Sequence, residues 1–385
     1  MDFDLSSDQR MLVDTVTAFV RKDSPISRFR ALREDEHGVG WDPAVLRKMG
    51  ELGWLGIPFP ESVGGLGWRC IDLALVLEPL GAALVPEPIL ASAMLGGLPV
   101  ARAGSEEQQG RWLPSAIAGE SILALAWMER IARDDAHHVT TRAAKAAKGW
   151  SLSGEKRWVL AGHAAQSFVV SARTAGNVDE QRGVSLFVVD RDMPGVRVQP
   201  AKTIDGHRAA TLILEDVSVG DDRRLGGDDE GSAALDWTLD FAAACACAEG
   251  LGIMTAVLQM TRDYLCQREQ FGVKIGTFQA LQHRCVDMFV ETELAKSTMI
   301  LGALSMDEQD DARRRRGVSA AKVQLATGGR LVTQQSIQLH GGIGITDEHD
   351  VGLFFKRMHA LNALFGDEDW HLRRFASLPG FAPQT

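Results

Sequence analysis

The stretch that decides the fold is REQFGVKIGTFQ, residues 268–279, which is followed further along the chain by QLHGGIG, residues 338–344. Arg268 offers a planar fork of donors that matches phosphate oxygens, while Gln279 and Gln338 offer neutral hydrogen bonds. Gly341 and Gly342 let backbone N–H groups come close to a ligand with no Cβ in the way. Alone, the glycines also fit a helix C-cap, and Arg268 a surface ion pair. Together, the two stretches predict a diphosphate-binding site.

The chain before these stretches changes from helical to β and back. Ser6 and Gln9 have the spacing of a capping box, Asp42-Pro43 is typical of a helix start, and residues 53–67 predict a loop. Runs rich in β-branched residues predict strands over 150–160, 167–172, 184–189 and 211–214. After a Gly/Asp-rich break at 226–231, long helices are predicted over 232–266, 278–306 and 312–340. The order predicts an α+β multidomain chain: helical 1–120, β 121–225 and helical 226–385.

Composition excludes several classes of partner. The net charge of −10 argues against nucleic acid, because phosphate binding needs a surplus of Lys and Arg. The five cysteines have no metal-site spacing, so we expect reduced thiols. The acidic start is unlike a signal peptide, and we expect no membrane span. These features favour a cytoplasmic protein.

With this α–β–α order, the two stretches resemble two signatures of acyl-CoA dehydrogenases, R-x-x-F-G-x-x-I-x-x-F-Q and Q-x-x-G-G-x-G. The resemblance implies an N-terminal helical domain, a central β-barrel-like domain and a C-terminal four-helix bundle. It also implies FAD as cofactor, an acyl-CoA substrate and an electron-transferring flavoprotein or similar acceptor. The expected contacts to the FAD are those of Arg268, Phe271, Gln279, Gln338, Gly341 and Gly342 to the ADP half and of Trp158 on a β-strand. In the family, the ADP contacts reach a FAD held mainly by a neighbouring subunit.

The sequence departs from this family where the catalytic base is expected. The family removes the α-proton of the substrate with a glutamate, commonly in a tract like Y-E-G-T, and Phe365 stands at that position here. Other relatives carry the base on the helix ahead of Arg268, where this chain has Ala242. Of the flavin-side tract T-E-P-x-x-G-S-D, the segment 128–135 keeps Glu129 and Asp135, and the hydroxyl expected two residues after Trp158 is replaced by Leu160.

Three acidic residues and one histidine are candidates to replace the base. For Glu249, on an apolar helix, we favour a buried ion pair over catalysis, with Arg284 or Lys322 as the partner. Asp367 and Glu368 are better explained as the N-cap and acidic first turn of the last helix. For His340, packing is favoured over acid–base chemistry.

Three functional hypotheses follow. The first is the base-lacking subunit of an α2β2 acyl-CoA dehydrogenase, which most resembles the small subunit of pimeloyl-CoA-type enzymes. The second is a self-sufficient homotetrameric dehydrogenase that uses Glu249 as an unusual base. The third is a structural relative that no longer binds flavin.

Overall fold

The computed structural model describes residues 5–132 and 134–380, which form two compact units. One unit consists of Met1–Glu34, Arg69–Val85 and Ala243–Thr385 and is almost wholly helical. The other consists of Asp35–Trp68 and Pro86–Ala242 and contains the main sheet. The helices that precede the sheet in sequence are thus shared between the two units.

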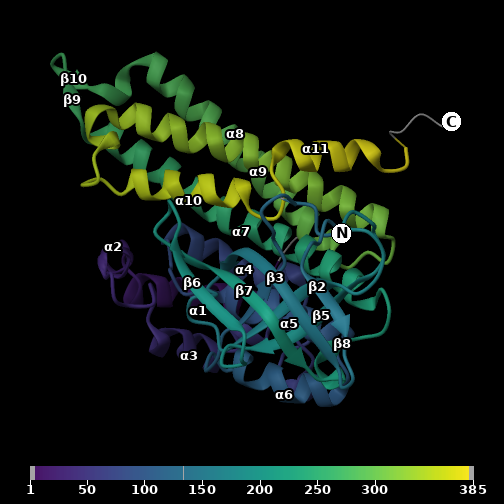
Figure 1. Cartoon of the computed structure of the whole chain (residues 1–385). Helices are drawn as coiled ribbons and strands as arrows, with labels where there is room; N and C mark the ends of the chain where they lie inside the picture. Colours follow the sequence, from purple (N-terminus) through teal and green to yellow (C-terminus); the bar gives the residue numbers. More distant parts are fainter. Residues whose placement is uncertain (1–4, 133, 381–385) are drawn as a thin grey trace. The chain divides into compact units, whose positions relative to one another are not determined.

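The helical unit is built around a bundle of long helices. These are α7 (Glu230–Gln267, which begins in the other unit), α8 (Gln279–Ser305), α9 (Asp311–His340), α10 (Val351–Ala363) and α11 (Glu368–Ser377). The helix α9 packs against α8, α10 and α11, and Figure 1 shows α8, α9 and α10 running side by side. The segments α1 (Ser7–Asp23), α2 (Ile26–Glu34) and α4 (Cys70–Ala82) complete the unit. The three long predicted helices are confirmed.

The helix α7 is apolar and buried on most sides, which explains its Ala- and Gly-rich sequence. A Cβ at Gly252 would lie 1.9 Å from the carbonyl oxygen of Glu78, so α4 and α7 approach each other closely. By length and hydropathy alone, α7 could cross a membrane, contrary to the sequence expectation that no such segment exists. However, 78% of its most apolar window is buried inside the protein, which is typical of a core helix.

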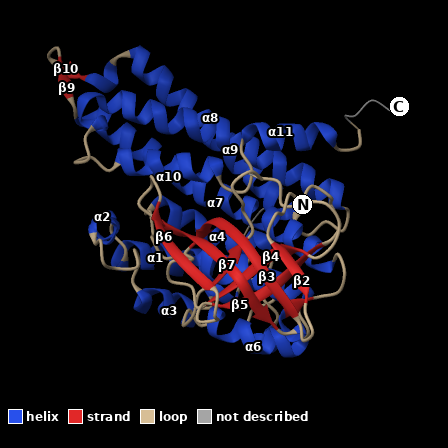
Figure 2. Cartoon of the chain, viewed as in Figure 1, coloured by secondary structure: helices blue, strands red, loops and turns tan. Residues whose placement is uncertain are grey.

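The second unit contains an eight-stranded sheet, drawn in red in Figure 2. Its strands run in the order β6 (Val196–Lys202), β7 (Arg208–Val219), β3 (Trp150–Leu160), β2 (Arg142–Lys145), β4 (Ser167–Arg173), β5 (Val184–Asp190) and β8 (Arg224–Leu225), and β1 (Leu123–Ala126) pairs with β4 in parallel. The helices α3 (Pro43–Glu51), α5 (Leu95–Ala103) and α6 (Glu106–Ile117) belong to the same unit. The four predicted strands are confirmed as β3, β4, β5 and β7.

Several local predictions from side-chain chemistry are also confirmed. Ser6 and Gln9 form the capping box of α1, and the Asp42 side chain accepts a hydrogen bond from the Ala44 N–H at the start of α3. The predicted loop at 53–67 includes two 3₁₀ turns, at Trp54–Gly56 and Glu61–Val63. The Asp367 side chain caps α11 by accepting from the Trp370 N–H at 2.8 Å.

Candidate functional site

The residues predicted to bind the diphosphate lie on exposed surface of the helical unit. Arg268 follows α7 directly and leads into the hairpin β9 (Glu269–Gln270) and β10 (Val273–Lys274). Gln279 begins α8, and Gln338 lies in the last turn of α9. Within residues 5–132 and 134–380, the side chains of these three residues have no hydrogen-bond or ion-pair partner. The surface ion pair considered for Arg268 is therefore not formed in the described chain, and its donors are free for a ligand.

Glycine at position 341 and glycine at position 342 have different structural explanations. Gly341 is the C-cap of α9 and has φ +65°, a conformation that glycine adopts without strain. Because it follows the C-terminal end of the helix, the α9 dipole does not favour an anion there. Gly342 has no positive φ, and a Cβ placed on it would meet no atom within 4 Å. The fold itself does not require a glycine at 342, whereas a ligand that approaches the backbone would.

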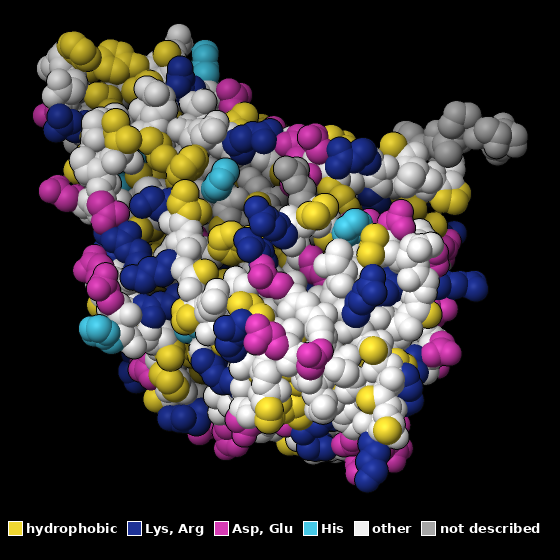
Figure 3. Space-filling model, viewed as in Figure 1, with side chains coloured by type: hydrophobic (Ala, Val, Ile, Leu, Met, Phe, Trp, Pro, Cys, Tyr) yellow, Lys and Arg dark blue, Asp and Glu magenta, His cyan; other side chains and the backbone are white. Residues whose placement is uncertain are grey.

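Exposed hydrophobic side chains surround this surface. Phe271, at the tip of the hairpin, is 89% exposed. Others lie in the hairpin, in the turn after α9 and on one face of α8, namely Val273, Phe278, Ile343, Ile345, Val286, Phe289, Val290, Leu294 and Leu301. Figure 3 shows hydrophobic side chains gathered at the end of the bundle that carries β9 and β10. A patch of this extent is typical of a surface that another chain covers.

Neither position expected for the base carries a titratable side chain, and both are buried. Ala242 lies within α7, and Phe365 follows α10 with φ +60°. The Phe365 carbonyl oxygen accepts a hydrogen bond from Nε2 of His371 at 3.0 Å. Burial of the His371 imidazole lowers its pKa to about 2, and the positive charge of Lys322 adds to this effect. A neutral histidine therefore fixes the backbone at one of the two positions where the sequence led us to expect a base.

The carboxylate of Glu249 is held in an ion pair between α7 and α10. Its Oε1 lies 2.6 Å from Nε of Arg357, and its Oε2 lies 3.0 Å from Nη2 of the same guanidinium. Along α7, Glu249 stands seven residues after Ala242, a rise of about 10 Å. The prediction of an ion pair is confirmed, which leaves the carboxylate engaged and far along the helix from the usual base position.

The partners predicted for Glu249 are wrong. Arg284 instead donates to Oε1 of Gln335 at 3.0 Å. Lys322 is buried and donates to the carbonyl oxygens of Leu361 and Leu364, both at 2.8 Å. A buried ammonium group at this place satisfies the free carbonyls at the end of α10, where the helix dipole also favours a cation.

In the sheet unit, Trp158 lies at an irregularity of β3 and is 51% exposed. Its φ of +51° is unusual for a bulky residue and coincides with the register shift of β3 between Lys156 and Val159. Nearby in sequence, the N–H of Arg157 donates to the Met128 carbonyl at 2.9 Å, so this strand is joined to the segment 128–135. Arg133 of that segment lies outside the described residues.

Glu129, retained from the family tract, forms a buried ion pair with Lys156, a residue that sequence reasoning missed. The Lys156 Nζ lies 2.7 Å from Glu129 Oε1 and 2.9 Å from Ser171 Oγ. Burial alone would raise the pKa of Glu129, but Lys156 and two threonine residues lower it to about 2. Burial lowers the pKa of Lys156 to about 8, so both groups are charged at neutral pH. The available signal in the sequence was a lysine inside the segment 150–160, which is predicted to be a strand.

A cavity of about 580 Å³ lies between α9, α10 and the start of α11. Its lining includes Arg330 and the three carboxylates of Asp367, Glu368 and Asp369. Arg330 Nη2 already pairs with Glu368 Oε2 at 2.9 Å. The three carboxylates outweigh the single arginine, so the cavity would repel a diphosphate. The exposed surface that carries Arg268 would not.

His340, the remaining candidate acid–base group, is packed as expected. Its ring centroid lies 4.6 Å from that of Tyr264, and its Nδ1 donates to the Ser336 carbonyl at 2.7 Å. Burial lowers the pKa of the imidazole, so it is neutral at physiological pH. Its role is to anchor the end of α9.

Three comparisons place the chain among known proteins. Family models described as the N-terminal, middle and C-terminal domains of acyl-CoA dehydrogenase match residues 6–120, 124–217 and 229–377. A probable acyl-CoA dehydrogenase of Bacillus subtilis, YngJ, is 31% identical over 357 residues, which cover 91% of this chain and 92% of the relative. The caffeyl-CoA reductase–Etf complex subunit CarC of Acetobacterium woodii is 28% identical over 84% of this chain and 86% of the relative. Among solved structures, a chain of the ChsE4–ChsE5 complex from Mycobacterium tuberculosis superposes with a TM-score of 0.88, at 29% identity and full coverage of both chains.

Proposed function

Because the chain belongs to the acyl-CoA dehydrogenase family, we propose that it is the base-lacking subunit of a heteromeric FAD-dependent acyl-CoA dehydrogenase. Enzymes of this family oxidise an acyl-CoA thioester between its α and β carbons. Bound FAD supplies the acceptor for the hydride that leaves the β carbon. This chain would bind and orient the cofactor, and a partner chain would provide the glutamate that takes the α-proton.

A single contrast carries this proposal. The donors suited to a diphosphate, on Arg268, Gln279 and Gln338, are exposed and have no partner within the described residues. The two positions where a base is expected hold the buried apolar side chains of Ala242 and Phe365. The chain therefore retains groups that act on a cofactor from outside and lacks the group that acts on the substrate.

The residues present fit the phosphate end of FAD. The guanidinium of Arg268 would neutralise and orient phosphate oxygens, and the amides of Gln279 and Gln338 would donate neutral hydrogen bonds. Gly342 leaves the backbone open to close approach, as the empty space around it indicates. Phe271, three residues after Arg268 and in ring contact with Phe278, would cover the cofactor and exclude water. In the sheet unit, Trp158 offers an exposed aromatic face to a flavin ring.

The proposed assembly is an α2β2 tetramer in which this chain is the β-like subunit. The exposed apolar face of α8 and the hairpin would be buried against the homologous partner. The ChsE4–ChsE5 structure is itself a complex of two differently named chains, and CarC belongs to a complex with Etf. These relatives support a heteromeric partner and an electron-transferring flavoprotein as acceptor. A cytoplasmic location and kinship with pimeloyl-CoA-type small subunits remain part of the proposal.

The alternatives have less support. A self-sufficient homotetramer would need Glu249 as base, but this carboxylate forms a bidentate ion pair with Arg357. A flavin-free structural relative would not explain why Arg268, Gln279 and Gln338 have no side-chain partner among the described residues, or why the space around Gly342 is open.

The test is to purify the chain alone and after co-expression with a homologous chain that carries the glutamate. We expect little flavin absorbance and poor turnover of acyl-CoA by the chain alone, and both to appear in the mixed complex. Full turnover by a purified homo-oligomer with one flavin per chain would refute the proposal and favour Glu249 as the base. Absence of flavin from every assembly would instead favour the structural relative.

A further inference from the structure

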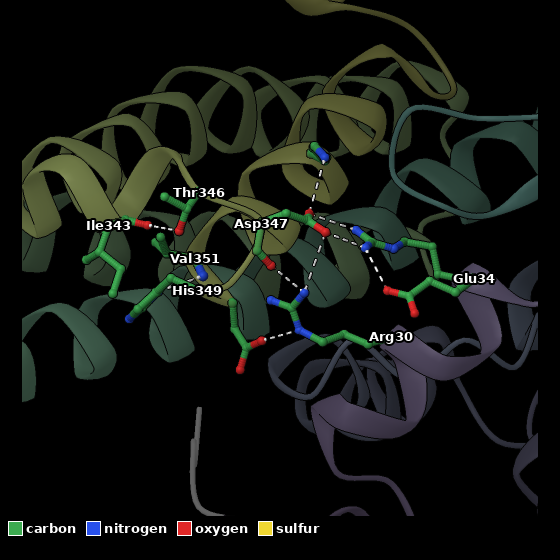
Figure 4. A network of polar contacts seen from close by, with 10 residues as sticks. Arg30, Glu34, Ile343, Thr346, Asp347, His349 and Val351 are labelled. Atoms are coloured by element: carbon green, nitrogen blue, oxygen red, sulfur yellow. Dashed lines mark hydrogen bonds and ion pairs between the residues drawn. The ribbon is translucent and has the colours of Figure 1, made fainter.

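The loop that follows the glycine turn is tied to α2 by two arginines. Arg33 binds the Asp347 carboxylate with both terminal nitrogens, at 3.1 Å from Nη1 to Oδ1 and 2.7 Å from Nη2 to Oδ2. Arg30 donates from Nη1 to the Asp347 carbonyl oxygen at 2.6 Å and from Nε to Asp350 Oδ1 at 2.8 Å. Figure 4 shows this network, with Asp347 facing the arginines of α2. The loop backbone and two of its side chains are thereby held by one short helix.

The other end of the turn is anchored by packed aromatic rings. The buried ring of His340 contacts the rings of Tyr264 and His349, with centroids 4.6 and 4.4 Å away, and these two rings also contact each other edge to face at 6.5 Å. The Nδ1 of His349 accepts the Val351 N–H at 3.2 Å, so this histidine lies within the same loop as the two aspartates. Burial lowers the pKa of His349, while the nearby charge of Asp350 raises it and that of Arg30 lowers it. The arginine network and the ring stack therefore meet at His349.

Between these anchors, most of the turn Gly341–Ile345 (η6) is exposed. Four of its five residues are exposed, and the exception is Gly344, where a Cβ would lie 2.6 Å from the Ile337 carbonyl oxygen. No atom would lie within 4 Å of a Cβ on Gly341 or Gly342. The turn is therefore held from its two ends, and its middle rests on α9 only at Gly344.

We propose that Arg30 and Arg33 are positioning residues that hold the glycine turn in the conformation that binds the FAD diphosphate. This inference rests on the proposed function, since it assigns these arginines a role in the same cofactor site. They are part of the N-terminal helical segment and act on the turn through Asp347 and Asp350 of the loop 346–350. A turn that is ordered before the cofactor arrives binds it without the entropic cost of ordering at that moment.

The chemistry of the contact distinguishes it from an ordinary surface ion pair. The guanidinium of Arg33 is planar and makes two parallel bonds, a geometry that lysine cannot reproduce. The bond from Arg30 to a backbone carbonyl fixes the chain itself and not merely a side chain. Of the side chains on α2, that of Phe29 is the buried one, so the two arginines are a principal attachment of this helix to the loop.

The experiment compares Arg33→Met, Arg33→Lys and Asp347→Asn with the unchanged protein in its native assembly. FAD is removed and then titrated back, and hydrogen exchange of the 341–346 backbone is measured without FAD. We expect Arg33→Met and Asp347→Asn to weaken FAD binding about fivefold and to speed exchange in the turn. Arg33→Lys should give a smaller loss, because it retains the charge but not the fork. The exchanged pair Arg33→Asp with Asp347→Arg should recover part of the affinity.

The matched control is Arg262→Met, which removes an exposed arginine that pairs with Asp263 at 2.8 Å on α7. It should change neither FAD affinity nor exchange in the turn. Unchanged affinity and exchange in both Arg33→Met and Asp347→Asn would overturn the positioning role. Arg268→Ala distinguishes a failure of the positioning role from a failure of the proposed function. If it weakens FAD binding while Arg33→Met does not, the inference alone fails, and if neither does, the proposed function fails as well.

Discussion

Replacing Glu249 by glutamine separates a structural carboxylate from a catalytic one. The side chains of Glu249 and Arg357 are 18% and 13% exposed, and two short bonds join them between α7 and α10. Breaking a fully buried pair costs about 3–5 kcal/mol, whereas an exposed pair contributes about 0–1 kcal/mol. This pair lies nearer the buried limit, but glutamine retains one acceptor oxygen. We therefore expect Glu249→Gln to lower the free energy of unfolding by about 2 kcal/mol.

The assay combines thermal unfolding of the assembled, FAD-loaded protein with turnover of an acyl-CoA. A loss of about 2 kcal/mol corresponds to a fall in Tm of roughly 4–8 °C for a unit of this size. Turnover at a temperature well below the Tm should remain nearly unchanged. If Glu249 were the base, the same variant would keep its Tm and lose about 100-fold or more in kcat, because proton abstraction would lack its acceptor.

Two further variants make this result specific. Glu308→Gln makes the same chemical change at an exposed carboxylate, whose nearest contact to Arg313 is 3.9 Å, and should leave the Tm nearly unchanged. The double variant Glu249→Gln with Arg357→Gln should lose no more free energy of unfolding than the two single variants lose together, since the two groups act as one pair. A stable, FAD-loaded Glu249→Gln complex without turnover would show the structural interpretation to be wrong.

Two other predictions concern cofactor retention and acid stability. Arg268→Ala and Gln338→Ala should each lower the FAD content of the assembled protein while leaving the yield and Tm nearly unchanged, since both side chains are exposed and unpartnered within the described residues; equal flavin content in both variants would contradict this. The carboxyl of Glu129 has a pKa of about 2, below its ordinary 4.5, so the stability it contributes is complete above about pH 4.5 and is lost as the pH falls towards 2. Urea unfolding at pH 6 and pH 3 should therefore show the deficit of Glu129→Gln, up to about 3 kcal/mol, shrinking at the lower pH; a constant deficit would exclude this linkage.

Residue composition predicted the long elements of both units. The long bundle helices have the predicted ranges to within a few residues, because segments rich in Ala, Leu and Met and nearly free of proline suit packed helices. The strand β3 also has its predicted range, although its buried residues Leu152, Lys156 and Val159 do not alternate. The strands β1 and β6 were missed for opposite reasons. The first, Leu123–Ala126, is buried throughout and resembles a helix in composition, and the second, Val196–Lys202, is largely exposed and contains Pro200.

The chemistry of the site was predicted in part, since local motifs do not report long-range partners. The need of Glu249 for a cation was deduced from its apolar helix, but Arg357 lies 108 positions further along the chain, and no spacing rule connects the two. The arginines of α2 were missed for the same reason, because Arg33 and Asp347 are 314 positions apart. Such pairs depend on tertiary packing, which a pattern in one segment cannot specify.

The burial of the two expected base positions and the exposure of the donor side chains support the proposed role of this chain. Phe365 and Ala242 are buried, so their apolar side chains stabilise the fold at positions where a carboxylate would cost several kcal/mol unless paired. Arg268, Gln279 and Gln338 are exposed and have no partner in the described chain, so they add little to its own stability. These residues contribute little to folding but have the donor groups that a phosphate site needs. A ligand bound at the surface of the chain would explain their presence. The physical division between a buried, apolar base position and an exposed donor set is therefore what a subunit would show if its chemistry were completed by a partner.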